Sequence, residues 1–482
     1  MDSSDTADAA PAPPNPSPMR QPPKFITGSL LNHILVMTGT GALGLMAIFV
    51  GDLANLIFLS WLKDEAIVAA VGYGSSILFL TISIGIGLSI AAISLVSPAI
   101  GARDFVAARR LTVHSFLATL IVAAVLSLVV WVSIPWLLQT LGAKGRTFDL
   151  ASTYLRILVP SLAPLALGMT AGGVLRSVGD ARRAMNVTLF GAIVNVILDP
   201  IFIFGFGWGL EGAAFASVIA RFAIMGVGLY GVIRVHNLMG RPQWDHFLAD
   251  AGPIAVVAVP AILANIATPF SNAYVTQAIS GYGDSAVAGW TIIGRILPVA
   301  VGAIYALSGS IGPILGQNFG AGETGRMRDA FTLALKVTAA FTLGAWLVLA
   351  LLAHPLAEGM HATPEAESLI VFYCRWLTPL FVFMGGLFIA NAAFNTLGRP
   401  RTSMVLNWAR ATIGTIPFVL AGGAMAGAKG ALAGHMLGGI AFGVIAVWLC
   451  YRHMDALAAR KIAQSTVQTA VPVVQERASG AQ

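Results

Sequence analysis

Residues 172–217 read GGVLRSVGDARRAMNVTLFGAIVNVILDPIFIFGFGWGLEGAAFAS, and their pattern is the clearest indication of the fold. Its central apolar run, 184–206, is long enough to cross the hydrocarbon core of a bilayer, which needs about 20 residues. A short polar segment with Arg176, Arg182 and Arg183 precedes that run, and a glycine-rich turn follows it. Short polar turns between long apolar runs are typical of a helical bundle embedded in a membrane.

The rest of the chain continues this pattern. Hydrophobic residues make up 57% of the 482 residues and charged residues 10%, with a mean hydropathy of +0.81. Soluble domains contain about 25% charged residues, so a soluble globular protein is excluded. A backbone in lipid must satisfy its own hydrogen bonds, so the apolar runs are expected to be helices. The sequence predicts an all-α integral membrane protein with about twelve transmembrane helices, at 30–58, 67–99, 112–138, 151–176, 184–206, 210–234, 252–280, 286–318, 331–353, 367–396, 402–424 and 430–451.

Lys and Arg residues predict the orientation. With the N-terminus placed inside, 18 of them fall in inside segments and four in outside loops, namely Lys63, Lys144, Arg146 and Lys429. This bias fits the positive-inside rule with both termini in the cytoplasm, as in a multi-pass protein of the bacterial inner membrane. The net charge of +7 is then a consequence of topology, and no nucleic-acid partner is expected.

The chain also resembles itself. Gly179 and Gly398 follow corresponding helices at an offset of 219 (398 − 179), and the segments around Pro160 and Pro379 have the same offset (379 − 160). The repeat divides the chain into two six-helix lobes, 26–240 and 241–455, between polar cytoplasmic tails at 1–25 and 456–482. Since six is even, both lobes start from the same side and form a parallel repeat. A cavity between such lobes suits alternating access, as in transporters.

Two carboxylates are expected inside the membrane, where ionisable groups are costly and functional by default. Asp52 and Asp199 lie in outward-running helices at a similar depth. Asn55 and Asn195 share a helix face with them by three- and four-residue spacing. Pro200 removes a backbone donor and is expected to kink the helix, and Ser217 of the next helix lies at a similar depth. We interpret this cluster as a site for H⁺ or Na⁺. The alternative is a protonated aspartate that caps the proline kink and serves structure only.

The second lobe has no such acids in its membrane runs, which places ion coupling in the first lobe. Arg221, Arg295 and Arg410 are expected to neutralise helix ends or to line the cytoplasmic entrance. No metal motif, catalytic set or cofactor site is found, and the two cysteines are interpreted as packing residues. Adaptable or aromatic side chains are expected to line a substrate cavity, with polar amides of the second lobe: Met37, Met169, Asn272, Tyr274, Tyr305 and Asn391.

Three segments carry a resemblance to the multidrug and toxic compound extrusion family: residues 83–110, 172–217 and IGPILGQNFGAG at 311–322. The resemblance implies two six-helix lobes arranged in a V. It also implies antiport of cationic, lipophilic drugs and dyes against H⁺ or Na⁺. The expected partners are organic cations, H⁺ or Na⁺ and membrane lipid, and the chain is expected to be a monomer.

Carried over by position, Asn195 and Asp199 match the family's first-lobe ion site, and Ser217 matches a hydroxyl position there. The family usually reads Val-Asp-Thr before its outer loop, and that position holds Asn55 in this sequence. Asp52 lies one turn earlier and is expected to substitute for it. Because the second lobe has no matching acids, H⁺ is favoured over Na⁺.

Three other readings remain open. A relative that flips lipid-linked oligosaccharides or lipids has the same lobes, although such proteins often carry extra helices and a cationic cavity. A membrane-embedded enzyme would need a nucleophile–base set or a metal motif. A channel fits the lobe repeat and the isolated carboxylates less well than a coupled carrier.

Overall fold

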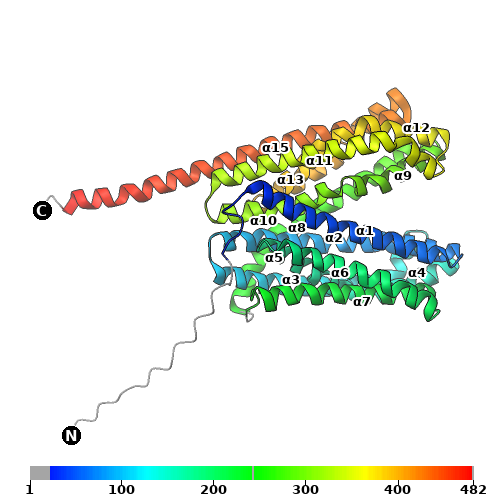
Figure 1. Cartoon of the computed structure of the whole chain (residues 1–482), viewed down its shortest axis with the longest axis horizontal. Helices are drawn as coiled ribbons and strands as arrows, with labels where there is room; N and C mark the ends of the chain where they lie inside the picture. Colours follow the sequence, from blue (N-terminus) through cyan, green and yellow to red (C-terminus); the bar gives the residue numbers. More distant parts are fainter. Residues whose placement is uncertain (1–21, 241–243, 480–482) are drawn as a thin grey trace, which may run out of the picture.

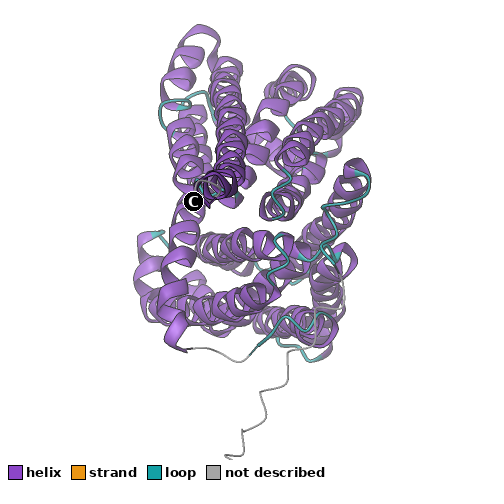
Figure 2. Ribbon diagram, turned by 90° about the vertical axis from the view of Figure 1, so that its left-hand side faces the viewer, coloured by secondary structure: helices purple, strands orange, loops and turns teal. Residues whose placement is uncertain are grey.

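The computed structural model describes residues 22–240 and 244–479, and these contain helices but no strand (Figure 2). The first lobe comprises α1 (Leu30–Ser60), α2 (Glu65–Gly101), α3 (Phe105–Thr140), α4 (Gly145–Leu158), η1 (Val159–Ser161), α5 (Leu162–Ser177), α6 (Ala181–Pro200), η2 (Ile201–Gly205), α7 (Gly209–Tyr230) and η3 (Gly231–Val235). The second comprises α8 (Trp244–Ser280), α9 (Asp284–Ala300), α10 (Gly302–Gly320), α11 (Thr324–Gly359), α12 (Pro364–Phe372), η4 (Tyr373–Leu377), η5 (Thr378–Leu380), α13 (Phe381–Thr396), α14 (Pro400–Ala411) and α15 (Ile416–Ser479).

Ten helical stretches of the described residues are long and apolar enough to span a membrane, and α9 with α10 form a bent pair that makes an eleventh. The last of the ten, which includes α14 and α15, contains a break, because Ala426 and Gly427 have non-helical backbone angles. The predicted runs 402–424 and 430–451 lie on either side of this break. Dividing the stretch there gives twelve spans within the described part of the chain.

Glycines fix the reversal at this break. Three glycines in the segment of α15 after the break are spaced by four residues, namely Gly430, Gly434 and Gly438. They therefore lie on one face of that segment. A methyl group added to them would overlap the carbonyl oxygens of Gly422, Phe418 and Gly414, respectively. The paired numbers run in opposite directions, so the two segments are antiparallel and their backbones nearly touch. Small residues at four-residue spacing permit this close approach between membrane helices.

The helices form the two lobes that the repeat predicts. In Figure 1, α4 to α7 lie below, and α11 to α13 with α15 lie above. Within the first lobe α6 packs between α1 and α7, and α2 packs against α5. Within the second, α13 packs against α10 and α15. The lobes meet chiefly through α1 against α10 and through α2 against both α8 and α10.

The lobe contacts concentrate at the end of the bundle that carries the Arg-rich loops, called here the Arg-rich end. Gln317 Nε2 donates to Ser177 O at 2.7 Å across the lobes. Asp250 at the start of α8 accepts hydrogen bonds from Arg110 Nε at 3.0 Å and His114 Nδ1 at 2.7 Å, both on α3. Toward the other end the two groups of helices draw apart (Figure 1). The structure therefore has its lobes closed at the Arg-rich end.

The ends of the chain differ from the predicted tails. Phe25 is buried in a core shared by α10, α11 and α13, and its backbone N–H donates to Gln317 Oε1 at 2.8 Å. Residues 22–25 thus join the fold, whereas the rest of the predicted tail, 1–21, lies outside the described residues. At the other end α15 continues as helix to Ser479.

Candidate functional site

Asp199 lies at the centre of the polar cluster in the first lobe. It occupies the last turn of α6, is fully buried, and precedes Pro200. Proline cannot donate a backbone hydrogen bond, and the helix widens at this point into the π-helical turn η2. The predicted kink therefore takes the form of a π-turn.

Two amides hold one oxygen of this carboxylate. Asn195 Nδ2, one turn earlier on α6, donates to Asp199 Oδ2 at 2.8 Å, and Asn55 Nδ2 of α1 donates to the same oxygen at 2.8 Å. The other oxygen, Oδ1, is buried and has no hydrogen-bond partner among the described residues. The helical spacing predicts the contact from Asn195. The contact from Asn55 depends on how α1 packs against α6, which the spacing does not specify.

Asp52 takes a different position from the one that a carboxylate pair requires. It lies on α1 three residues before Asn55, is exposed, and makes no hydrogen bond with Asp199 or Asn55 among the described residues. Its charge interacts with that of Arg221 on α7. Asn55, at the position where the family usually has an aspartate, is thus the α1 residue that reaches Asp199.

Arg221 connects this cluster to a break in the fourth span. Its Nη1 donates to Leu158 O at 3.1 Å and to Ser161 Oγ at 3.0 Å, at the junction of α4 and η1. It therefore neutralises a helix end, which was one of its two expected roles. Ser217, one turn earlier on α7, is half-buried and makes no hydrogen bond with Asp199 in the described part of the chain.

The residues predicted to line a substrate cavity lie in several environments. Met37 is 3% exposed and lies in the core between the lobes, where Ser310 Oγ donates to its backbone oxygen. Met169 lines a narrow apolar crevice between α2, α3 and α5. Asn391 accepts a hydrogen bond from Ser403 Oγ at 3.1 Å. Each of these three side chains therefore has packing or bonding partners of its own.

The other three predicted cavity residues are more open. Asn272 on α8 is exposed, and Tyr274 is half-buried against the second-lobe core. Tyr305 on α10 is 36% exposed and lies against Phe388 with ring centroids 5.5 Å apart. Of the predicted set, these residues have surface available to a solute.

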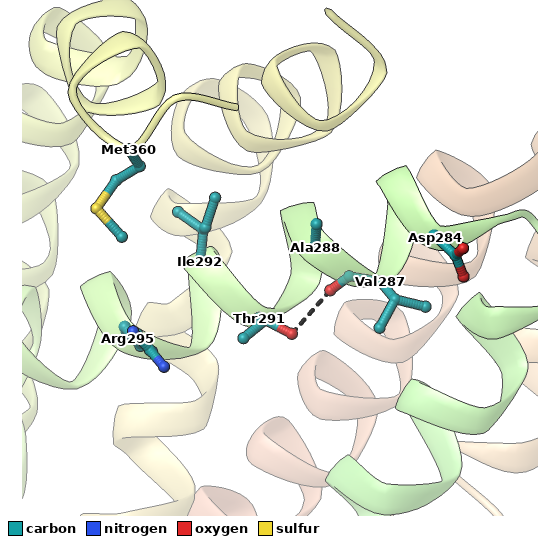
Figure 3. A pocket seen from close by; sticks show the side chains of 7 residues that line it. All are labelled: Asp284, Val287, Ala288, Thr291, Ile292, Arg295 and Met360. Atoms are coloured by element: carbon teal, nitrogen blue, oxygen red, sulfur yellow. Dashed lines mark hydrogen bonds between the residues drawn. The ribbon is translucent and has the colours of Figure 1, made fainter. Parts of the chain in front are cut away.

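A groove of about 420 Å³ lies elsewhere, along one face of α9 (Figure 3). Asp284 and Arg295 lie at its two ends, and Met360 from the end of α11 reaches over it. Thr291 Oγ1 within the groove donates to Val287 O at 2.8 Å, so this hydroxyl serves its own helix. None of the predicted site residues lines the groove.

The described residues contain no group of three or more His, Cys, Asp or Glu side chains placed to hold a metal ion. Cys374 and Cys450 are buried and unpaired. Asp199 with its two amides is a small, mostly neutral site around one carboxylate, which suits a single proton or one monovalent cation.

Comparisons with known proteins identify the family. The MatE family model matches residues 42–201 and 260–421. A FAD transporter from Shewanella oneidensis is 29% identical over 87% of this chain and 94% of its own length. The multidrug export protein MepA from Staphylococcus aureus is 23% identical over 77% of this chain and 81% of its own length.

The solved structures agree on the fold. A mutant of the MATE transporter VcmN from Vibrio cholerae superposes with a TM-score of 0.84 and 26% identity, over 90% of this chain and 99% of that one. These relatives are named as transporters or export proteins rather than as enzymes. The family match over both lobes, together with the helical fold, shows that this chain is a multi-pass membrane transporter belonging to the MatE family of multidrug and toxic compound extrusion proteins.

Proposed function

We propose that this transporter is an antiporter that exports lipophilic organic cations in exchange for H⁺ or Na⁺, with Asp199 as the coupling residue. One observation carries the proposal: Asp199 is fully buried, neutral amides hold one of its oxygens, and the other oxygen has no partner among residues 22–240 and 244–479. A buried carboxylate without a cationic partner carries a large desolvation cost. Taking up H⁺ or Na⁺ removes that cost.

Coupling then follows from competition for one negative charge. With the lobes closed at the Arg-rich end, the cluster is served from the opposite side of the membrane. Binding of H⁺ or Na⁺ neutralises Asp199 and releases an organic cation held by its charge. After the lobes rock, the ion leaves on the other side and the carboxylate is again free for substrate.

The proposal also includes the membrane in which the protein lies and its orientation there. The positive-inside pattern assigns the Arg-rich end and both termini to the cytoplasm. The chain would then lie in the inner membrane of a bacterial cell, where we expect it to act as a monomer. The relatives from two bacteria are consistent with this assignment.

The test is ethidium efflux from proteoliposomes under an imposed gradient of H⁺ or Na⁺, applied one at a time. We expect one gradient to drive efflux and Asp199→Asn to abolish it. Asp284→Asn is the matched control, because it removes an exposed carboxylate at the start of α9. Unchanged efflux by the Asp199→Asn variant would rule out this coupling residue. No efflux under either gradient would favour the flippase reading, which fluorescent lipid-linked substrates would test next.

A second candidate substrate is a flavin dinucleotide. The relative named as a FAD transporter matches most of both chains. The second lobe favours such an anion electrostatically, since its interior contains the buried Arg410. Efflux of FAD and of ethidium from the same vesicles separates the two candidates.

A further inference from the structure

Arg410 is a buried cation in the second lobe, and no acidic residue in the described part of the chain neutralises it. It lies in the last turn of α14 and is 2% exposed. Its Nη2 donates to Thr268 Oγ1 of α8 at 3.2 Å, while its Nε is buried and has no partner among the residues that the structure describes. A guanidinium group has five N–H donors. In the described part of the chain its side chain makes this one hydrogen bond and no ion pair, so most of its donors are unused.

Arg221 of the first lobe shows what a satisfied arginine looks like in this protein. It donates to two oxygens at the end of α4 and interacts with the charge of Asp52. Both arginines lie inside the membrane, where an unpaired charge is costly. Arg221 thus has a structural explanation, whereas the positive charge of Arg410 has none within the lobe.

Arg410 has polar and aromatic neighbours, since Thr415 Oγ1 donates to its backbone oxygen at 2.9 Å and lies 3.4 Å from His435 Nδ1. The charge of Arg410 interacts with the Tyr305 hydroxyl and with the imidazole of His435 on α15. The ring of Tyr305 lies against Phe388, and that of His435 lies edge-on to Trp290 at 6.4 Å.

Tyr305 is also the open side of this group. It is 36% exposed although α10 is packed against α1, α2, α11 and α13. Part of the Tyr305 ring is therefore open to a solute, although helices of both lobes pack around α10. Such a solute would meet an aromatic surface with a guanidinium group behind it.

We propose that Arg410 binds the anionic group, a phosphate or carboxylate, of an aromatic solute whose ring lies against Tyr305 and Phe388. This inference rests on the proposed transport function, because the solute would be cargo of the cavity between the lobes. An anion removes the cost of the unpaired guanidinium and fills its free donors, which match phosphate and carboxylate oxygens in pairs. The two rings offer offset or edge-on contacts to a flat solute.

The experiment measures binding of FAD, FMN and riboflavin to the purified full-length chain by quenching of flavin fluorescence. Riboflavin has the same ring system without phosphate. We expect the wild-type chain to bind FAD and FMN at least about tenfold more tightly than riboflavin, the effect of one or two charge-assisted hydrogen bonds. Arg410→Gln should abolish this preference and leave riboflavin affinity unchanged, and Arg410→Lys should retain part of it. Arg375→Gln is the control, since it removes an exposed arginine of the same lobe.

Equal affinity of the wild-type chain for all three flavins would overturn the proposal. So would an equal loss for all three in Arg410→Gln together with a lower melting temperature, which would make Arg410 a structural link between α14 and α8. Displacement of FAD by phosphatidylglycerol, with no preference for aromatic phosphates, would assign the site to a lipid headgroup instead. Ethidium efflux on the same preparation tests the coupled transport separately, because its failure leaves the flavin preference intact.

Discussion

Corresponding positions of the two lobes serve different purposes. At the 219-residue repeat offset set by Gly179 and Gly398, Asn195 and Asp199 of α6 correspond to Gly414 and Phe418. In the first lobe this helix face holds a buried carboxylate and its amides. In the second lobe Phe418 lies before the break in α15, and the chain there packs so tightly against the segment after the break that Gly438 and Gly434 leave no room for a methyl group. One duplicated helix thus provides an ion site in one lobe and a helix-packing surface in the other.

The cations of the two lobes differ in the same way. Arg221 interacts with Asp52 and with a helix end, while Arg410 has no acidic neighbour in the described residues. Among the described residues, the spans of the first lobe therefore contain two carboxylates, Asp52 and Asp199, whereas Arg410 of the second lobe has no carboxylate near it. A carrier with this asymmetry can hold a coupling cation on one side of its cavity and an anionic group on the other.

The largest effect is expected from a substitution that adds a side chain at the close helix contact in the second lobe. Gly438→Ala places a methyl group on the carbonyl oxygen of Gly414. Because the atoms that this methyl group meets belong to the backbone of Gly414, the two helices must move apart. We expect a loss of about 2 kcal/mol or more in the free energy of unfolding. The measurement is thermal unfolding of the purified protein in detergent.

Gly344→Ala on α11 is the control for that variant. A methyl group at Gly344 meets no atom within 4 Å, and alanine is the better helix former. Its melting temperature should match or slightly exceed that of the wild-type chain. If both variants melted at the same temperature, the close contact between Gly438 and Gly414 would not hold the second lobe together.

A smaller effect is expected from substitutions on α1, which test whether Asp52 or Asn55 acts on Asp199. The sequence alone predicts that Asp52→Asn costs more export than Asn55→Ala. The structure favours the opposite order, since Asn55 bonds Asp199 directly while Asp52 interacts with Arg221. We expect Asn55→Ala to slow ethidium efflux about tenfold, as the loss of one hydrogen bond to a charged group predicts, and Asp52→Asn to slow it less. Efflux rates at saturating gradient would decide, and a greater loss in Asp52→Asn would restore the original assignment.

Sequence patterns predict the fold well here because the bilayer imposes it. Apolar run length and the Arg-rich loops give the spans, and the repeat gives the two lobes. Even so, the patterns do not show that Asn55 points toward Asp199, because only the packing of α1 on α6 sets that contact. They also place Met37 in a cavity, whereas close approach of α1 to α10 buries it. Nor do they show that Arg410 makes no ion pair among the described residues, because this depends on how α8 and α15 pack against α14.

The smallest expected effect compares the loops that follow the repeated glycines. Asp180 directly follows Gly179, and Arg399 directly follows Gly398. The two loops therefore carry opposite charges at corresponding positions. Asp180 caps α6 by accepting from the backbone N–H of Arg183, and it pairs with Arg183 Nη1 at 2.6 Å and His236 Nε2 at 2.9 Å. Arg399 makes no side-chain cap for α14. The first-lobe helix therefore depends on its loop, while the second-lobe helix begins with Pro400.

The pH dependence of stability tests this difference. Burial acts to raise the pKa of Asp180, but the hydrogen bonds from His236 and Arg183 outweigh it and hold the pKa well below the ordinary 3.8. A carboxylate whose pKa is lowered by folding stabilises the folded state at pH values above its unfolded pKa, which is about 3.8 for Asp180. This stabilisation is lost progressively as the pH falls from that value toward the lower pKa of the folded state. Asp180→Asn should thus lower the melting temperature at pH 7 by about 1–3 °C, and Arg399→Gln by less. The gap between wild type and Asp180→Asn should close in acid; a gap of the same size at pH 7 and pH 3 would mean that the charge of Asp180 does not hold this loop.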